Sequence, residues 1–304
     1  MEGSLRSSDK TPSNERETRE SVVIRFAGDS GDGMQLTGSQ FTLSSAIVGN
    51  DLATFPDYPA EIRAPAGTTF GVSAFQVHFS AQHILTPGDE PEVLVAMNPA
   101  ALKVNLTDLD PGGMIVIDQD AFSQKNLRKA GYNTNPIEDQ SLEGYRVFAL
   151  DMSRLTQAAV KPFGLSQKDS LRCKNMWALG LMMWMYDRNR EPTINWLQQK
   201  FANRSEIAEA NIAALNAGHA YGETAELPDL GQGYAVPRAE IAPGEYRAVT
   251  GSEALAWGLA AGAHLADLKL VFASYPITPA SNLLHILAGL KAQGIVTFQA
   301  EDEI

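Results

Sequence analysis

Largely apolar runs of the length of buried strands recur along residues 21–222, and stretches with helical spacing separate them. The runs are residues 22–26 (VVIRF), 93–97 (VLVAM), 114–118 (MIVID) and 145–150 (YRVFAL). Strands that alternate with helices form βαβ units. The pattern therefore predicts an α/β fold with a mostly parallel or mixed sheet.

A stricter alternation occurs at residues 75–79. Phe75, Val77 and Phe79 are apolar, whereas Gln76 and His78 between them are polar. This period of two is typical of a strand with one buried and one exposed face. We therefore predict a half-exposed strand here, at an edge of the sheet.

Helical patterns take several forms. Residues 174–185 (KNMWALGLMMWM) are apolar almost all round, which predicts a buried helix. A Met-rich groove for a partner is the alternative, because thioethers repack easily. Residues 205–216 have amphipathic spacing and predict another helix. Asn98 followed by Pro99 predicts a helix start with a capping side chain and a proline at the first position.

The periodic pattern stops at residues 223–245, which hold three prolines and three glycines. We interpret this segment as a linker or an extended arm between domains. At the other end, residues 1–20 are polar and carry charges of both signs, which predicts a disordered leader.

A second domain is predicted from residue 246. Thr250 and Glu253 have the spacing of a capping box at a helix start. Strands are predicted at residues 270–273 and 295–299, with a helix between them. Two helices and two strands cannot cover both faces of a parallel sheet. We therefore expect residues 246–304 to be only the start of this domain.

Composition and charge exclude several classes of protein. The chain has 304 residues, a formal net charge of −12 and a single cysteine, Cys173. The negative charge disfavours a general nucleic-acid surface and anionic membranes. No run approaches a membrane span, which takes about 18 apolar residues or more. One cysteine cannot form an internal disulfide, which suits a reducing cytoplasm.

The stretch GDSGDGMQLTG, residues 28–38, follows the first predicted strand and leads into a helix. Its glycines have the order G-x-x-G-x-G, so it matches neither the dinucleotide fingerprint nor a Walker A loop. Asp29 and Asp32 would repel a phosphate unless they turn away or meet a cation. We expect a structural corner near a ligand, and direct contact with a cofactor is the second interpretation. The candidate cofactor-binding residues here are Gly28, Ser30, Gly31 and Gly33.

The segment 55–68 (FPDYPAEIRAPAGT) is a predicted loop of a length that is often functional. Its Arg63 is a further candidate for binding a carboxylate or phosphate of a cofactor, with a solvated or ion-paired arginine as the alternative. The five histidines show no metal-ligand spacing, so no metal site is predicted.

Three stretches of the second domain carry a family resemblance: TGSEALAWGLAAG, FASYPITPASNLLHIL and FQAEDEI. Together they resemble the pyrimidine-binding domain of 2-oxoacid:ferredoxin oxidoreductases. GDSGDGMQLTG, the Arg63 loop and the NPAAL segment resemble the γ domain of the same enzymes. The order γ then α is similar to the fused subunit of the 2-oxoglutarate type. The resemblance thus makes residues 21–222 a γ domain on the coenzyme A side and residues 246–304 the start of a pyrimidine-binding domain.

The resemblance implies site residues in the second domain. Thiamine diphosphate needs a carboxyl group at a pyrimidine ring nitrogen, and the matched residue is Glu303, the candidate catalytic group. Thr278 matches a residue that binds the 2-oxo acid, and Tyr275 and Ile277 would shape the wall of the site around that substrate. The alternative interpretation of Glu303 is a solvated residue in an acidic turn. The alternative interpretation of Thr278 is a helix cap or turn residue.

The resemblance also implies partners. Such enzymes convert a 2-oxo acid, here 2-oxoglutarate by similarity, to an acyl-CoA and pass electrons through iron–sulfur clusters to ferredoxin. One cysteine cannot hold a four-iron cluster, which needs about four thiolates. A separate β subunit would carry the cluster and the Mg²⁺ and diphosphate ligands, in an (αβ)2 assembly, and the chain alone would be inactive. The alternatives are a stand-alone nucleotide-binding protein, a non-catalytic assembly module or another thiamine enzyme.

Overall fold

The structure is a computed structural model that describes residues 16–60, 64–225, 233–277 and 280–302. The chain divides into two compact units, Met1–Pro243 and Gly244–Ile304. Each unit is described by itself below. The predicted division into γ domain, linker and pyrimidine-binding domain stays a prediction.

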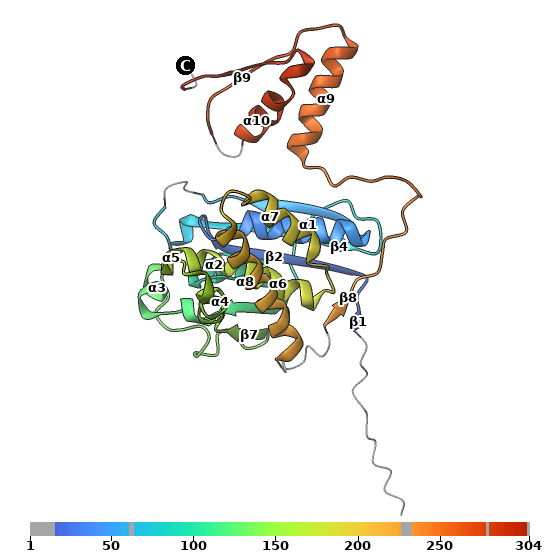
Figure 1. Cartoon of the computed structure of the whole chain (residues 1–304). Helices are drawn as coiled ribbons and strands as arrows, with labels where there is room; N and C mark the ends of the chain where they lie inside the picture. Colours follow the sequence, from blue (N-terminus) through green and yellow to red (C-terminus); the bar gives the residue numbers. More distant parts are fainter. Residues whose placement is uncertain (1–15, 61–63, 226–232, 278–279, 303–304) are drawn as a thin grey trace, which may run out of the picture. The chain divides into compact units, whose positions relative to one another are not determined.

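A six-stranded mixed sheet forms the centre of the first unit (Figure 1). β2, β5, β6 and β7 run parallel to one another, and β4 runs antiparallel to both of its neighbours, β2 and β3. In spatial order, the strands are β3 (Asp51–Asp57), β4 (Val72–Ser80), β2 (Ser21–Asp29), β5 (Val93–Ala96), β6 (Met114–Asp118) and β7 (Arg146–Leu150). The predicted α/β class with a mostly parallel or mixed sheet is confirmed.

Helices cover both faces of this sheet, so its central strands are buried on both sides. Val93 and Val95 of β5 belong to one core, and Leu94 and Ala96 between them belong to the other. The first core packs on α1 (Met34–Val48), α4 (Met152–Val160), α6 (Lys174–Met185), α7 (Glu191–Lys200) and α8 (Ser205–Thr224). The second packs on α2 (Pro99–Asn105) and α3 (Gln124–Lys129).

Shorter helical segments complete the unit. They are α5 (Gln167–Arg172), η1 (Thr69–Gly71), η2 (Leu106–Asp108), η3 (Gln119–Ala121) and η4 (Lys161–Phe163). The buried helix predicted at residues 174–185 is confirmed, because every residue of α6 after Lys174 is buried. Asn98 caps α2 as predicted, with its Oδ1 accepting from the Ala101 N–H.

The strand around residues 75–79 is not the half-exposed edge strand that its alternation predicted. β4 lies inside the sheet, with β2 on one side and β3 on the other. Its polar side chains are buried or half-buried because they are hydrogen-bonded. The Gln76 amide donates to the Pro87 and Gly88 carbonyls, at 2.8 and 2.6 Å, and His78 Nε2 lies 2.8 Å from Ser21 Oγ.

Two predicted boundaries also differ from the structure. The loop predicted at residues 55–68 begins inside edge strand β3, which tolerates Pro56 because its outer side needs no N–H donor. The prediction of a disordered leader over residues 1–20 is wrong for residues 16–20. Arg16 Nη1 donates to the Trp184 carbonyl, at 2.7 Å, and β1 (Glu17–Thr18) pairs with β8 (Tyr234–Ala235) inside the predicted linker.

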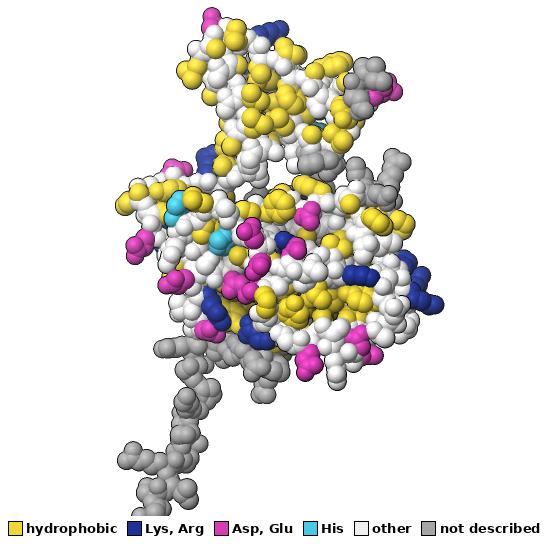
Figure 2. Space-filling view, turned by 180° about the vertical axis from the view of Figure 1, so that it is seen from behind, with side chains coloured by type: hydrophobic (Ala, Val, Ile, Leu, Met, Phe, Trp, Pro, Cys, Tyr) yellow, Lys and Arg dark blue, Asp and Glu magenta, His cyan; other side chains and the backbone are white. Residues whose placement is uncertain are grey.

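The second unit contains α9 (Gly251–Leu265), β9 (Val271–Ser274), α10 (Ser281–Gly289), η5 (Lys291–Gln293) and β10 (Val296–Gln299). β9 and β10 form a two-stranded parallel sheet. The capping box predicted at Thr250 and Glu253 is present, with both reciprocal hydrogen bonds. Many large apolar side chains are exposed, among them Leu265, Leu268 and Phe298, and Figure 2 shows hydrophobic side chains gathered on the visible face of this unit.

Candidate functional site

The order of the strands reverses between β2 and β5. From β2 the chain continues through α1 to β3 and β4 on one side of the sheet, whereas β5 leads to β6 and β7 on the other side. In open α/β sheets, ligands bind beyond the carboxyl ends of the strands at such a switch point. The glycine loop after β2 and the Met97–Asn98 turn after β5 both lie there, so this edge is the candidate ligand site of the first unit.

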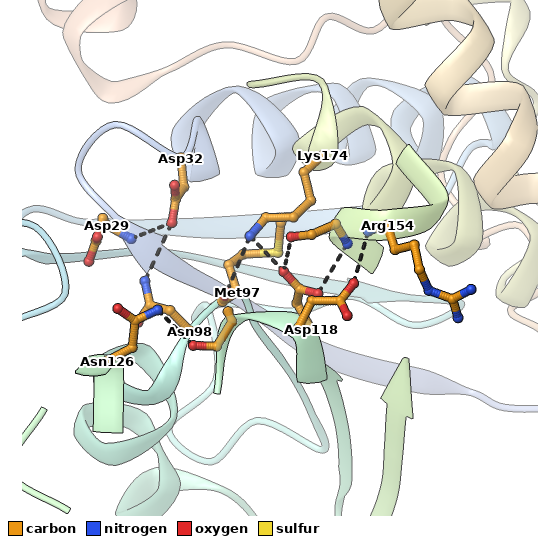
Figure 3. A network of polar contacts seen from close by, with 11 residues as sticks. Asp29, Asp32, Met97, Asn98, Asp118, Asn126, Arg154 and Lys174 are labelled. Atoms are coloured by element: carbon orange, nitrogen blue, oxygen red, sulfur yellow. Dashed lines mark hydrogen bonds and ion pairs between the residues drawn. The ribbon is translucent and has the colours of Figure 1, made fainter. Parts of the chain in front are cut away.

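Both aspartates of the glycine loop accept hydrogen bonds from nearby donors, and Figure 3 shows those that Asp32 accepts. Asp32 Oδ2 accepts from the Asp29 N–H at 2.8 Å and from Asn98 Nδ2 at 3.5 Å. Asp29 Oδ2 accepts from the Gly67 N–H at 2.8 Å, which ties the loop to the segment after β3. The aspartates therefore organise three segments of backbone around the switch point.

The Asp29 carboxyl group lies where charge is disfavoured. Its Oδ1 is buried and has no hydrogen-bond partner among the described residues. Burial raises the pKa of Asp29 above its ordinary value, and the neighbouring Asp32 carboxylate raises it further. The Gly67 N–H, the Asn98 amide and the charge of Lys129 act in the opposite direction. Asp29 thus holds a proton more readily than a solvated aspartate.

The four candidate residues of the loop share one turn but differ in their surroundings. A Cβ atom on Gly28 would lie 2.9 Å from Asp32 Oδ2, and one on Gly33, whose φ is +77°, would lie 2.4 Å from Asn175 Nδ2. No heavy atom lies within 4 Å of the corresponding position at Gly31. The Ser30 N–H is already bonded to the Gly71 carbonyl, at 3.1 Å. Packing therefore explains Gly28 and Gly33, and the open side of the loop is at Ser30 and Gly31.

A buried ion pair ties the neighbouring strand ends together. Asp118, the last residue of β6, is fully buried, and its Oδ2 lies 2.8 Å from Lys174 Nζ at the start of α6. The same carboxylate accepts from the Ser153 hydroxyl at 2.6 Å, and Lys174 Nζ also donates to the Met97 carbonyl at 3.4 Å (Figure 3). Breaking one partner of such a pair leaves an uncompensated buried charge. The pair therefore fixes the ends of β5 and β6 beside the glycine loop.

The second unit brings the ends of its two parallel strands together. Ser274 of β9 is in register with Gln299 of β10, and the Ala300 N–H donates to the Ser274 carbonyl at 2.9 Å. Tyr275 and Ile277 follow β9 directly, and the Ile277 side chain is exposed. Thr278 and Glu303 lie outside the described residues, as does Arg63 of the first unit.

Sequence reasoning missed Asp118, Lys174 and Asn175 as parts of this region. One local signal existed, since an acidic residue ending a buried apolar strand must find partners. No local signal pairs it with a lysine 56 residues later in the chain. Within the part of the chain that the structure describes, no group of three or more His, Cys, Asp or Glu side chains could hold a metal ion.

Over residues 23–221 the sequence matches the family model described as pyruvate ferredoxin/flavodoxin oxidoreductase. The chain belongs to this family. It is 56% identical over 290 residues to the 2-oxoglutarate oxidoreductase subunit KorA of Mycobacterium tuberculosis, a match that covers 95% of this chain and 44% of KorA. It is 30% identical over 213 residues to the ketoisovalerate oxidoreductase subunit VorA of Methanothermobacter marburgensis, covering 68% of this chain and 37% of VorA.

A solved structure with a similar fold is the 2-oxoglutarate:ferredoxin oxidoreductase from Magnetococcus marinus with 2-oxoglutarate, coenzyme A and succinyl-CoA bound. The TM-score is 0.68 at 27% sequence identity, over 93% of this chain and 44% of that one. The chain thus spans less than half the length of these relatives. Among the described helices, none combines the length and apolar character needed to cross a membrane.

Proposed function

We propose that the chain forms part of a 2-oxoglutarate:ferredoxin oxidoreductase, which converts 2-oxoglutarate and coenzyme A to succinyl-CoA and CO2 and passes two electrons to ferredoxin. The observation that carries the proposal is the 56% identity to a 2-oxoglutarate oxidoreductase subunit over 95% of the chain. The Magnetococcus marinus structure supports the same substrate, since it binds 2-oxoglutarate and succinyl-CoA on a similar fold.

In the second unit, the arrangement of the strands fits a shared thiamine diphosphate site. Because β9 and β10 are parallel and in register, the segments that lead to Thr278 and Glu303 leave the sheet at the same edge. The Glu303 carboxyl would hold a proton at a pyrimidine ring nitrogen, and Thr278 with Tyr275 and Ile277 would contact the 2-oxo acid. Thiamine diphosphate supplies the electron sink for decarboxylation, and the protein supplies orientation and electrostatics.

In the first unit, the switch point fits the approach of coenzyme A. The glycine loop is open at Gly31, where no described atom lies within 4 Å of the position that a Cβ atom would take, and the Asp29 and Asp32 carboxylates are turned to backbone donors. We propose that Gly28, Ser30, Gly31 and Gly33, with Arg63, form a wall of the coenzyme A site.

The proposal requires a second subunit. The chain has one cysteine, whereas a four-iron cluster takes about four thiolates. We infer that a β subunit holds the iron–sulfur cluster and the Mg²⁺ and diphosphate ligands, in an (αβ)2 assembly that reduces ferredoxin in the cytoplasm.

The test is a comparison of two neighbouring glutamates in the assembled enzyme. Glu303→Ala should lower 2-oxoglutarate-dependent dye reduction by about 100-fold or more, the usual effect of removing a proton-handling side chain. Glu301→Ala is the matched control and should leave turnover within about twofold, because a solvated carboxylate nearby contributes little. Succinyl-CoA formation is measured beside pyruvate and 2-oxoisovalerate as competing substrates.

Two results would contradict the proposal. Unchanged turnover of the Glu303→Ala assembly would remove the proposed role of that carboxyl. Oxidation of pyruvate in preference to 2-oxoglutarate, or tight binding of NAD by the chain with no reaction of any 2-oxo acid, would overturn the substrate or the function itself.

A further inference from the structure

A cavity of about 290 Å³ lies in the helical layer of the first unit, with Asn175 of α6 among its lining residues. Its walls come from α1, α5, α6, α7 and α8 and the turns beside them. Leu36, Leu165, Leu197, Phe201 and Ile207 make most of this wall apolar. Ligand sites are commonly apolar clefts of a few hundred Å³ with a small number of placed polar groups, so this cavity has the size for a small molecule.

One buried polar side chain lines the cavity with free donor capacity. Asn175 is only 6% exposed, and its Oδ1 accepts from the Met176 N–H at 2.8 Å. Its Nδ2 donates no hydrogen bond to a described residue, although an amide nitrogen carries two donors. This nitrogen is not one of the buried atoms that lack a partner, so it keeps accessible surface from which it can donate. A ligand oxygen in the cavity would satisfy it.

The polar side chains of the cavity leave one positive charge in excess. Arg172 is paired with Asp169, with 2.9 Å between Nη1 and Oδ1. Arg204 lines the same cavity with its guanidinium 5.8 Å from the centre of the Phe201 ring, and it forms no ion pair with a described residue. Two arginines against one carboxylate therefore match a single negative charge on a ligand.

We propose that this cavity binds a small monocarboxylate with an apolar body. The apolar part would lie against the leucines and Phe201, the carboxylate would meet Arg204 in the bidentate geometry that guanidinium favours, and a ligand oxygen would accept from Asn175. Asn175 also contacts the glycine loop, since its Nδ2 occupies the space that a side chain on Gly33 would need. The proposal adjoins the glycine loop at Gly33 but does not depend on what that loop binds.

The experiment is calorimetry on the full 304-residue chain with three probes. We expect 4-phenylbutyrate to bind one site per chain with a dissociation constant of about 0.1–1 mM, the range for a ligand of its size. Butyrate lacks the apolar body and 4-phenylbutan-1-ol lacks the charge, and each should bind at least about tenfold more weakly, since each loses one of the two contacts.

Two variants place the binding in this cavity. Arg204→Gln removes an exposed charge and keeps the fold, and it should weaken 4-phenylbutyrate binding about tenfold. Asn175→Asp replaces the free donor with a carboxylate and should weaken it further. Arg128→Gln, an exposed arginine that does not line the cavity, is the matched control and should bind as the parent does. No saturable binding of 4-phenylbutyrate, or equal affinity of the parent and Arg204→Gln, would overturn the proposal.

Discussion

At the scale of single residues, Asp29 orders the glycine loop through a hydrogen bond, but its partly buried charge costs free energy. Its carboxylate accepts the Gly67 N–H and so holds the segment after β3 against the glycine loop. The same group is partly buried beside Asp32, with one oxygen lacking a partner among the described residues. A carboxyl group whose pKa is raised on folding stabilises the fold in its protonated form. That contribution is complete at pH values below the ordinary pKa of an aspartate and is lost as the pH rises through the raised pKa of the folded state.

We therefore predict that Asp29→Asn stabilises the chain at pH 7, by on the order of 1 kcal/mol or less for a partly solvated group. The asparagine keeps an oxygen for the Gly67 N–H but carries no charge. The parent carboxyl loses its charge as the pH falls through the raised pKa of Asp29, so the advantage should shrink there. Urea unfolding from pH 4 to pH 8 measures it, with the exposed Asp89→Asn as control. A variant less stable than the parent at pH 7 would show that Asp29 gains more from its charge than it loses.

At the scale of elements, α6 and α8 cross at two glycines. A Cβ atom on Gly180 would lie 1.9 Å from the Leu215 carbonyl oxygen, and one on Gly218 would lie 1.9 Å from the Trp177 carbonyl oxygen. Backbone atoms on both sides leave no flexible group that can move away. The two helices therefore approach closely only because both positions lack a side chain.

Gly180→Ala should destabilise the first unit by about 2–3 kcal/mol or more, because the helices must separate to admit one methyl group. This loss should outweigh the gain of about 1 kcal/mol in helix propensity. Gly258→Ala in α9 is the matched control, since nothing lies within 4 Å of its Cβ position. Thermal and urea unfolding of both variants give the comparison. Unchanged stability of Gly180→Ala would mean that the crossing is looser than the structure has it.

The same elements show what the sequence could predict. Local runs of apolar residues determine β5, β6 and α6. Capping residues within three positions determine the starts of α2 and α9. These elements could therefore be predicted from the sequence alone. β4 lies inside the sheet because β3 pairs with its outer side. The sequence did not predict β3 as a strand, because Pro56 is typical of a loop. In the candidate site, the spacing of the glycines at residues 28–33 was sufficient to predict the turn. The Asp118–Lys174 pair and the Asn175–Gly33 contact join distant segments, and only the folded chain brings them together.

At the scale of the whole molecule, the two units differ in how much core each has. The first unit has two extensive cores, on either face of its sheet. Among the described residues of the second, the buried apolar side chains are Ala256, Leu284, Leu287 and Ile295. Its two-stranded sheet is largely exposed, and every residue of β9 and β10 is intermediate or exposed. Isolated two-stranded sheets are marginally stable, so β9 and β10 depend on a small number of contacts.

We predict that amide hydrogens of β9 and β10 exchange at least on the order of 100-fold faster than those of β5 and β6, because exchange follows the free energy of local opening. Hydrogen–deuterium exchange with mass spectrometry on the chain at pH 7 measures both units in one sample, so the first unit is the internal control. If the proposed β subunit shares the thiamine site, its addition should slow exchange in β9 and β10 and leave β5 and β6 unchanged. Equal protection of the two sheets in the chain alone would contradict the prediction, because the contacts within residues 244–304 would then suffice to hold β9 and β10.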